Sequence, residues 1–83
     1  MITVTLFTRK NCHLCDQLKS DLLSLQSQYP HQLVEIDIDT DPSLVQKYGE
    51  RIPVIQISSY TRQAPITLQD LRLALAASHD SGQ

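Results

Sequence analysis

Apolar and polar residues follow a strand-like pattern at the start of the chain and a helical pattern directly after it. Residues 2–7 are a short run of β-branched and apolar residues, which is typical of a buried central strand. After a polar loop, leucines recur at helical spacing and predict a helix from about residue 12 to near Pro30: Leu14, Leu18, Leu22 and Leu25. Residues 32–38 then alternate polar and apolar side chains, which predicts a second strand with one face more buried. A strand, a helix and a second strand form a βαβ unit with parallel strands.

A short second helix is predicted in the middle of the chain. Residues 39–42, with the sequence Asp-Thr-Asp-Pro, are typical of a helix start, because Asp and Thr act as caps and Pro fits the first helical position. The helix over residues 43–48 is expected to end at Gly49, in the left-handed conformation that often closes a helix.

Two short strands and a last helix complete the pattern. Residues 53–57 predict a third strand, residues 58–63 a turn, and residues 64–66 a weak final strand. The apolar face of the last helix consists of Leu68, Leu71 and Leu75, and residues 79–83 are expected to fray. The order is therefore βαβαββα, which belongs to the α/β class, and we expect one domain over residues 1–83.

Composition and charge exclude several classes of function. A chain of 83 residues with 41% hydrophobic and 19% charged residues is typical of one compact domain with a small core. The formal net charge of -2, with scattered basic residues, gives no basic surface for nucleic acid or for an anionic membrane. We see no signal peptide and no apolar run of membrane-spanning length, so we expect a cytoplasmic protein, and we expect a monomer.

The chemistry of the chain is concentrated in its only two cysteines, Cys12 and Cys15. Positions three apart at the start of a helix share a face, so the two sulfurs can approach within disulfide distance. The amino end of a helix favours a thiolate, and Arg9 and Lys10 just upstream add positive potential. We therefore predict Cys12 as the nucleophile in thiol–disulfide exchange and Cys15, one turn further in, as the resolving thiol.

The two residues between the cysteines have more than one interpretation. A His13 imidazolium would stabilise a nearby thiolate, but His13 is equally interpreted as an exposed residue of the first helical turn. Leu14 is interpreted as a packing residue or as part of a surface that contacts a substrate.

Metal ligation is the main alternative for the cysteine pair, because two cysteines at this spacing form half of a structural zinc site. The second half is missing, since His13, His31 and His79 lack the close spacing of zinc ligands. An iron–sulfur cluster shared between two chains is a variant of the same alternative. We predict no metal site, and we interpret the acidic residues at 37, 39 and 41 as a solvated strand end and helix cap.

The chain resembles the short glutaredoxin-like branch of the thioredoxin-like superfamily. The resemblance rests on the strand over residues 4–7 leading into Cys-His-Leu-Cys-Asp at 12–16, on residues 34–41, and on residues 48–54. It implies a glutaredoxin-type, three-layer sandwich around a four-stranded mixed sheet. It also implies a cis peptide bond before Pro53, opposite the cysteine pair, and a dithiol oxidoreductase that reduces disulfides in protein substrates.

The resemblance also implies a binding groove. Lys10, Ile52 and Pro53 match parts of a glutathione groove, and the backbone of Ile52 would pair with an extended substrate. The Gly-Gly pair of true glutaredoxins is absent, because residues 64–68 are Ala-Pro-Ile-Thr-Leu. The electron donor is therefore left open between glutathione and a reductase, and no tightly bound cofactor is expected. A different class of function, a binding module with unreactive cysteines, also fits the fold.

Overall fold

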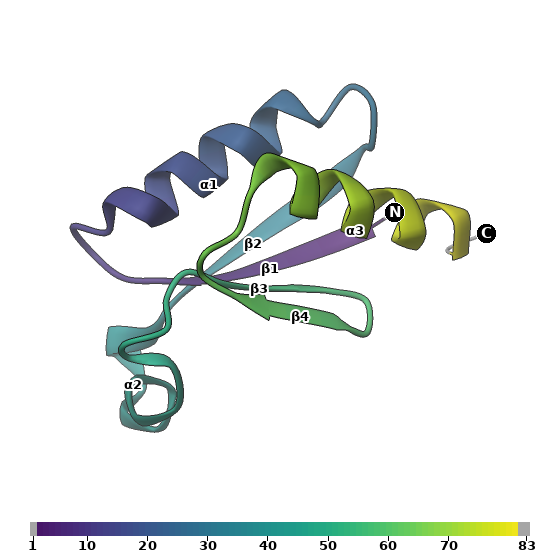
Figure 1. The fold of residues 1–83 in the computed structure, drawn as a ribbon. Coiled ribbons are helices and arrows are strands. Elements are labelled where there is room, and N and C mark those ends of the chain that lie inside the picture. The colour runs from purple at the N-terminus through teal and green to yellow at the C-terminus, as the bar shows by residue number, and fades with distance from the viewer. Residues whose placement is uncertain (1, 82–83) are drawn as a thin grey trace.

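A four-stranded mixed sheet with helices on both faces forms the part of the chain that the structure describes (Figure 1). The structure is a computed structural model that describes residues 2–81, with side chains as far as residue 78. The elements in chain order are β1 (Ile2–Thr8), α1 (His13–Ser24), β2 (His31–Asp37), the 3₁₀ turn η1 (Ile38–Thr40), α2 (Pro42–Tyr48), β3 (Val54–Ile57), β4 (Tyr60–Gln63) and α3 (Leu68–Ser81). The strand order is β2-β1-β3-β4, which confirms the predicted α/β class and the mixed sheet.

Strand β1 lies in the centre of the sheet because it pairs along both edges. It runs parallel to β2 over its whole length and antiparallel to β3. Val4 and Leu6 are fully buried on one face, and the neighbouring Phe7 is buried on the other. The sequence prediction of a buried central strand is confirmed, and the parallel pairing confirms the βαβ unit.

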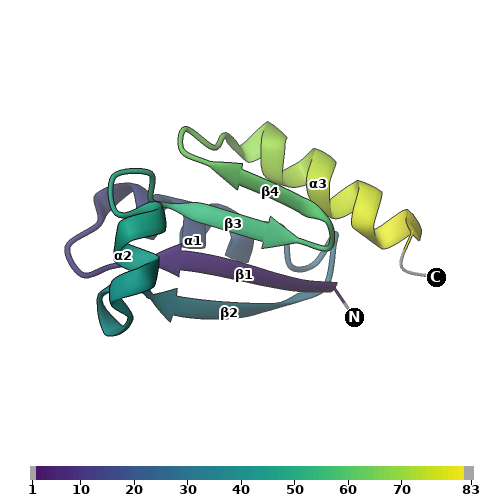
Figure 2. The ribbon, with the colours of Figure 1, turned by 90° about the horizontal axis from the view of Figure 1, so that it is seen from below.

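The helices form two layers of different extent. Helices α1 and α3 cover one face, whereas the short α2 covers only one end of the other (Figures 1 and 2). The larger core lies under α1 and α3 and includes Leu18, Leu22, Leu71 and Leu75. The smaller core lies under α2, where the Phe7 and Tyr48 rings pack with centroids 4.7 Å apart. No helix within residues 2–81 is long and apolar enough to span a membrane.

The fourth strand lies at residues 60–63, where the sequence analysis predicted a turn, and not at residues 64–66. Ile57 pairs with Tyr60, so the turn is confined to two residues, and the first of them, Ser58, has a positive φ of 54°. Positive φ in a two-residue hairpin matches the twist of the flanking strands. Strand β4 is an edge strand with mostly exposed polar side chains, which explains why it carries no apolar signal.

Three helix ends also differ from the sequence predictions. Helix α1 ends at Ser24 and a series of turns fills the space before Pro30. Gly49 has a right-handed φ of -46°, so it is not the left-handed residue we expected. A Cβ at Gly49 would lie 2.5 Å from the Val45 carbonyl oxygen, so close backbone approach explains the glycine. Helix α3 continues to Ser81 through part of the segment expected to fray, and residues 82–83 lie outside the described residues.

Neighbouring leucines on α1 provide a test of the core. Leu22 is 1% exposed and Leu23 is 74% exposed. We predict that Leu22→Ala lowers the free energy of unfolding by about 2–5 kcal/mol, because it removes buried methyl groups and leaves a cavity. Leu23→Ala is expected to change it by less than about 0.5 kcal/mol. Urea unfolding measures both, and equal losses would contradict the observed orientation of α1.

Candidate active site at the amino end of α1

Cys12 and Cys15 form a disulfide at the start of α1. Their Cα atoms are 5.2 Å apart, which confirms that the spacing brings the two sulfurs together. Cys12 is the N-cap of α1 and has an extended backbone, with φ of -99° and ψ of 101°. Cys12 is half-buried, whereas Cys15 is 1% exposed. The two sulfurs therefore differ in their access to a large substrate.

One backbone N–H of the first helical turn contacts the Cys12 sulfur. The N–H of Cys15 donates to Cys12 Sγ over 3.1 Å, in the way that it would donate to a capping oxygen. The N–H of Asp16 donates to the Cys12 carbonyl, also over 3.1 Å. A hydrogen-bond donor and the positive end of the helix dipole both favour negative charge on this sulfur. When reduced, the site is arranged to stabilise a Cys12 thiolate.

The peptide bond between Ile52 and Pro53 is cis, which confirms the expectation from the resemblance. A second cis bond joins Ala64 to Pro65, and the N–H of Ala64 donates to the Pro53 carbonyl over 3.0 Å. The Ile52 side chain packs against the smaller core. Within residues 2–81, the Ile52 backbone takes part in no backbone–backbone hydrogen bond outside the strands and helices. The peptide before Pro53 is therefore available to pair with a ligand.

The predicted site residues lie on two sides of the loop between β1 and α1, residues 9–12, which we call the Cys12 loop. Leu14, which is 61% exposed, and Pro53 line one apolar groove. Lys10 lines a separate polar depression, and His13 is exposed and lines neither. The structure thus joins Leu14 to Pro53 across about forty residues of sequence, but it does not bring Lys10 into the same groove.

The polar depression contains its own charge balance. Lys19 contacts Asp16 over 3.4 Å and Glu35 over 3.3 Å. The hydrogen bond and charge of Glu35, followed by those of Asp16, raise the pKa of Lys19 above its ordinary value. The Lys19 charge on this side of the Cys12 loop is therefore already balanced, whereas Lys10 takes part in no ion pair within the described residues.

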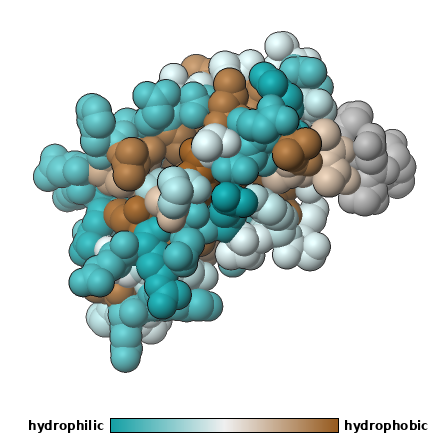
Figure 3. All heavy atoms as spheres, in the orientation of Figure 1, coloured by the Kyte–Doolittle hydropathy of each residue, from teal (hydrophilic) through white to brown (hydrophobic). Residues whose placement is uncertain are grey.

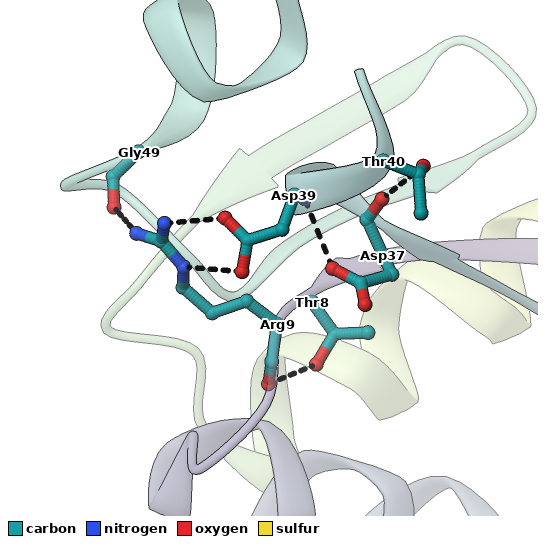
Figure 4. A network of polar contacts seen from close by, with 6 residues as sticks. All are labelled: Thr8, Arg9, Asp37, Asp39, Thr40 and Gly49. Carbon is teal, nitrogen blue, oxygen red and sulfur yellow. Dashed lines mark hydrogen bonds and ion pairs between the residues drawn. The ribbon is translucent and has the colours of Figure 1, made fainter. Parts of the chain in front are cut away.

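Arg9 connects the loop before Cys12 to η1 and to the residue that follows α2 (Figure 4). Its guanidinium donates to both carboxylate oxygens of Asp39, over 2.6 and 3.3 Å, and to the Gly49 carbonyl over 3.2 Å. The hydrogen bond from Arg9 lowers the pKa of Asp39, and the same contact raises the pKa of Arg9. The Arg9 charge is thus balanced by Asp39, which corrects our expectation that Arg9 supplies positive potential to Cys12.

The acidic residues after β2 serve as caps. Asp37 Oδ1 accepts the N–H of Asp39 over 2.9 Å, and Thr40 Oγ1 donates to the Asp37 carbonyl over 2.7 Å (Figure 4). Asp41 caps α2 by accepting the Ser43 N–H over 2.9 Å. Among the described residues, no group of three His, Cys, Asp or Glu side chains is arranged as metal ligands. These contacts agree with the interpretation of residues 37–41 as a strand end and a cap.

Comparison with known proteins places this site in a family. A family model described as a glutaredoxin-like domain (DUF836) matches residues 3–76. The chain belongs to this glutaredoxin-like family. Target protein XcR50 from X. campestris is 32% identical to it, with a TM-score of 0.77 over 89% of this chain and 96% of that one. A search of the curated proteins finds no match.

More distant structures share the fold of this glutaredoxin-like domain. Protein Ne2328 from Nitrosomonas europaea is 23% identical, with a TM-score of 0.71 over 87% of this chain and 88% of that one. Oxidised thioredoxin O2 from Arabidopsis thaliana is 20% identical, with a TM-score of 0.65 over 93% of this chain and 74% of that one. These likenesses confirm the thioredoxin-like fold that the resemblance implied.

Sequence reasoning missed two features of this glutaredoxin-like site. One is the contact of Arg9 with Asp39, which lies thirty residues further along the chain. The other is Pro65, which joins Pro53 and Leu14 in lining the apolar groove. The signals were present as an arginine near the end of β1 and an X-Pro pair before α3, but only the folded chain shows their partners.

The Arg9–Asp39 contact predicts a pH-dependent stability for this glutaredoxin-like domain. Arg9 depresses the pKa of folded Asp39, so the contact is fully stabilising above the ordinary Asp pKa of about 4 and is lost as pH falls through the folded value. Asp39→Asn is therefore expected to lower the free energy of unfolding at neutral pH and to have a smaller effect at about pH 2.

Urea unfolding at a series of pH values measures this difference. Glu50→Gln is the control, because it also removes one exposed carboxylate. A loss in Asp39→Asn that stayed constant from neutral to acid pH would show that the ion pair is not its cause.

Proposed function

We propose that this protein is a dithiol oxidoreductase that reduces disulfide bonds in substrate proteins, with Cys12 as the nucleophile and Cys15 as the resolving thiol. The observation that carries the proposal is the position of Cys12 Sγ, half-buried at the N-cap of α1 with the Cys15 N–H 3.1 Å away. The buried Cys15 supports a division of labour, because a large substrate meets Cys12 first. Membership of the glutaredoxin-like family supports the same chemistry.

The reaction balances in two exchange steps. The Cys12 thiolate attacks one sulfur of the substrate disulfide, that bond breaks, and the other substrate sulfur leaves as a thiolate and takes up a proton. Cys15 then loses its proton and attacks Cys12 Sγ, which releases the second substrate thiol and forms the Cys12–Cys15 disulfide. Two electrons pass to the substrate, and an external thiol returns them to the protein by the reverse exchange.

The Ile52 peptide gives the substrate a place to bind. Its backbone groups lie just before β3 and are free of the backbone–backbone hydrogen bonds found elsewhere between residues 2 and 81. An extended substrate segment can add its own backbone hydrogen bonds there. In this proposal Leu14 and Pro53 contact the substrate from the groove side, while Lys10 and His13 contact it from the exposed end of the Cys12 loop.

The start of α3 favours a dithiol reductase over glutathione as the electron donor. Thr67 and Asp70 form a capping box, in which the Thr67 N–H donates to Asp70 over 2.9 Å and the Asp70 N–H donates to Thr67 over 3.1 Å. The hydrogen bond from the Thr67 backbone lowers the pKa of Asp70, so a carboxylate already occupies this helix end. Arg62 Nε lies 3.5 Å from this carboxylate, so the helix end already has its cap and its counter-charge, and a carboxylate of glutathione bound there would have to displace Asp70.

Cysteine variants test the proposed roles in an insulin-disulfide reduction assay. Wild-type protein is expected to reduce insulin, and Cys12→Ser is expected to fall to the background rate because the attacking sulfur is lost. Cys15→Ser is expected to stop after the first step and to accumulate a mixed disulfide, seen by mass spectrometry as an adduct that a reductant removes. Equal behaviour of the two variants would contradict the division of labour.

The same assay identifies the electron donor when it is run in two forms. One contains glutathione and its reductase, and the other contains thioredoxin reductase. Faster turnover with thioredoxin reductase than with glutathione supports a dithiol reductase as the electron donor, as inferred from the capped start of α3. If neither donor sustains turnover and Cys15→Ser forms no adduct, the oxidoreductase proposal is wrong and a binding role takes its place.

A further inference from the structure

An open apolar groove lies beside the cysteine pair, between α1 and the segment that leads into α3. We call this the Pro53–Pro65 groove, and its lining includes Leu14, Gln17, Asp21, Pro53, Pro65 and Ile66. Its volume is about 110 Å³, which gives room for an aliphatic side chain. Figure 3 shows brown hydrophobic surface in this region with teal hydrophilic residues around it.

The lining of the groove includes Leu14, which directly precedes Cys15 in the sequence, whereas neither cysteine is part of it. Leu14 lies between the two cysteines and is 61% exposed, although it begins the leucine pattern of α1. Ile66 and Pro65 lie opposite, on the segment before α3. Apolar side chains that gather around a concave site next to a reactive group are typical of ligand recognition.

The wall of the groove opposite α1 is fixed before any ligand binds. The N–H of Ala64 donates to the Pro53 carbonyl over 3.0 Å and fixes the segment before α3 against the loop before β3. Pro65 has no N–H to offer, so this wall contacts a ligand through its ring. The groove is therefore suited to an apolar side chain, whereas the backbone hydrogen bonds of a ligand belong at Ile52.

One side of the groove carries a negative charge. Asp21 is half-buried on α1 and accepts a hydrogen bond from Gln17 Nε2 over 3.1 Å. Among the ion pairs of the described residues, none involves Asp21, and the nearest lysine in sequence, Lys19, contacts Asp16 and Glu35. A basic side chain on a ligand would complement this carboxylate.

We propose that the Pro53–Pro65 groove selects substrate proteins that carry an aliphatic side chain and a basic side chain close to the cysteine that Cys12 attacks. The inference rests on the proposed function and names its substrate class. An extended peptide that pairs with Ile52 points alternate side chains to one side, so residues within two positions of its cysteine can reach the groove.

Single-turnover kinetics with peptide disulfides test the inference. Each synthetic peptide contains one cysteine in a mixed disulfide with a coloured aromatic thiol, and the reduced protein is the only reductant. Cys12 attacks the peptide sulfur, the aromatic thiolate leaves and is measured, and Cys15 then releases the peptide thiol. The peptides differ in Leu or Ser at each position within two residues of the cysteine, and in Lys or Glu at each position two to four residues from it.

We expect one position at which Leu gives a rate about tenfold higher than Ser. Lys is expected to exceed Glu by about threefold at low salt, and this preference should shrink as salt is added. Ile66→Ser is expected to reduce the Leu preference to less than about twofold. Asp21→Asn is expected to remove the Lys preference and to leave the Leu preference in place.

The control variant is Leu23→Ser, which makes the same kind of change on an exposed residue of α1 outside the groove. It is expected to keep both preferences. A small aromatic disulfide without a peptide measures the chemistry alone, and its rate should be the same in wild type and Leu23→Ser. Far-UV circular dichroism and a measurable rate with this disulfide show that Ile66→Ser and Asp21→Asn are folded and reactive.

The outcomes separate the two proposals. Reduction of the small disulfide without any Leu preference, or a preference that Ile66→Ser leaves intact, overturns the groove inference alone. The same holds if Leu23→Ser loses the preference as fully as Ile66→Ser. If wild-type protein reduces neither the small disulfide nor any peptide, the proposed function is overturned and the groove inference with it.

Discussion

The pairing of β1 with both of its neighbours is the constraint on which the candidate site depends. Phe7 near the end of β1 lies opposite Ile36 in β2 and opposite Val54 at the start of β3. The Cys12 loop leaves the sheet directly after β1, and Pro53 directly precedes Val54. Strand register and the burial of the central strand therefore bring two segments forty residues apart to the same end of the sheet. No direct bond between the two segments is needed to hold them there.

The contact of Arg9 with Asp39 and Gly49 adds a second restraint at that end of the sheet. It also changes which groups can stabilise negative charge on Cys12. An arginine three residues before a cysteine suggests a cation that stabilises the thiolate. In the fold this guanidinium is directed at Asp39 and at the carbonyl that follows α2. Arg9 is therefore not the group that stabilises negative charge on Cys12, whereas the Cys15 N–H, which the helix itself positions, lies 3.1 Å from the sulfur.

The parts of the fold that could be predicted are those in which a local pattern and burial agree. The leucines of α1 recur at helical spacing because one helix face is buried, and the cysteine spacing brings two sulfurs together through helix geometry alone. Strand β4 could not be predicted in this way, because Thr61 and Gln63 are exposed and the pairing that holds them belongs to β3. The partners of Arg9 and Pro65 depend on long-range register, and no local pattern encodes it.

The two sides of the Cys12 loop differ in a way that bears on how a substrate approaches. On one side Lys19 is already paired with Asp16 and Glu35, so a ligand there would have to displace existing ion pairs and desolvate charged groups. On the other side Leu14, Pro65 and the half-buried Ile66 present apolar surface whose burial is favourable. Since the Ile52 peptide belongs to the same loop as Pro53, backbone pairing and apolar burial would act on one segment of a substrate in the proposed function. Approach from the groove side is therefore the arrangement that the physical chemistry of this site favours.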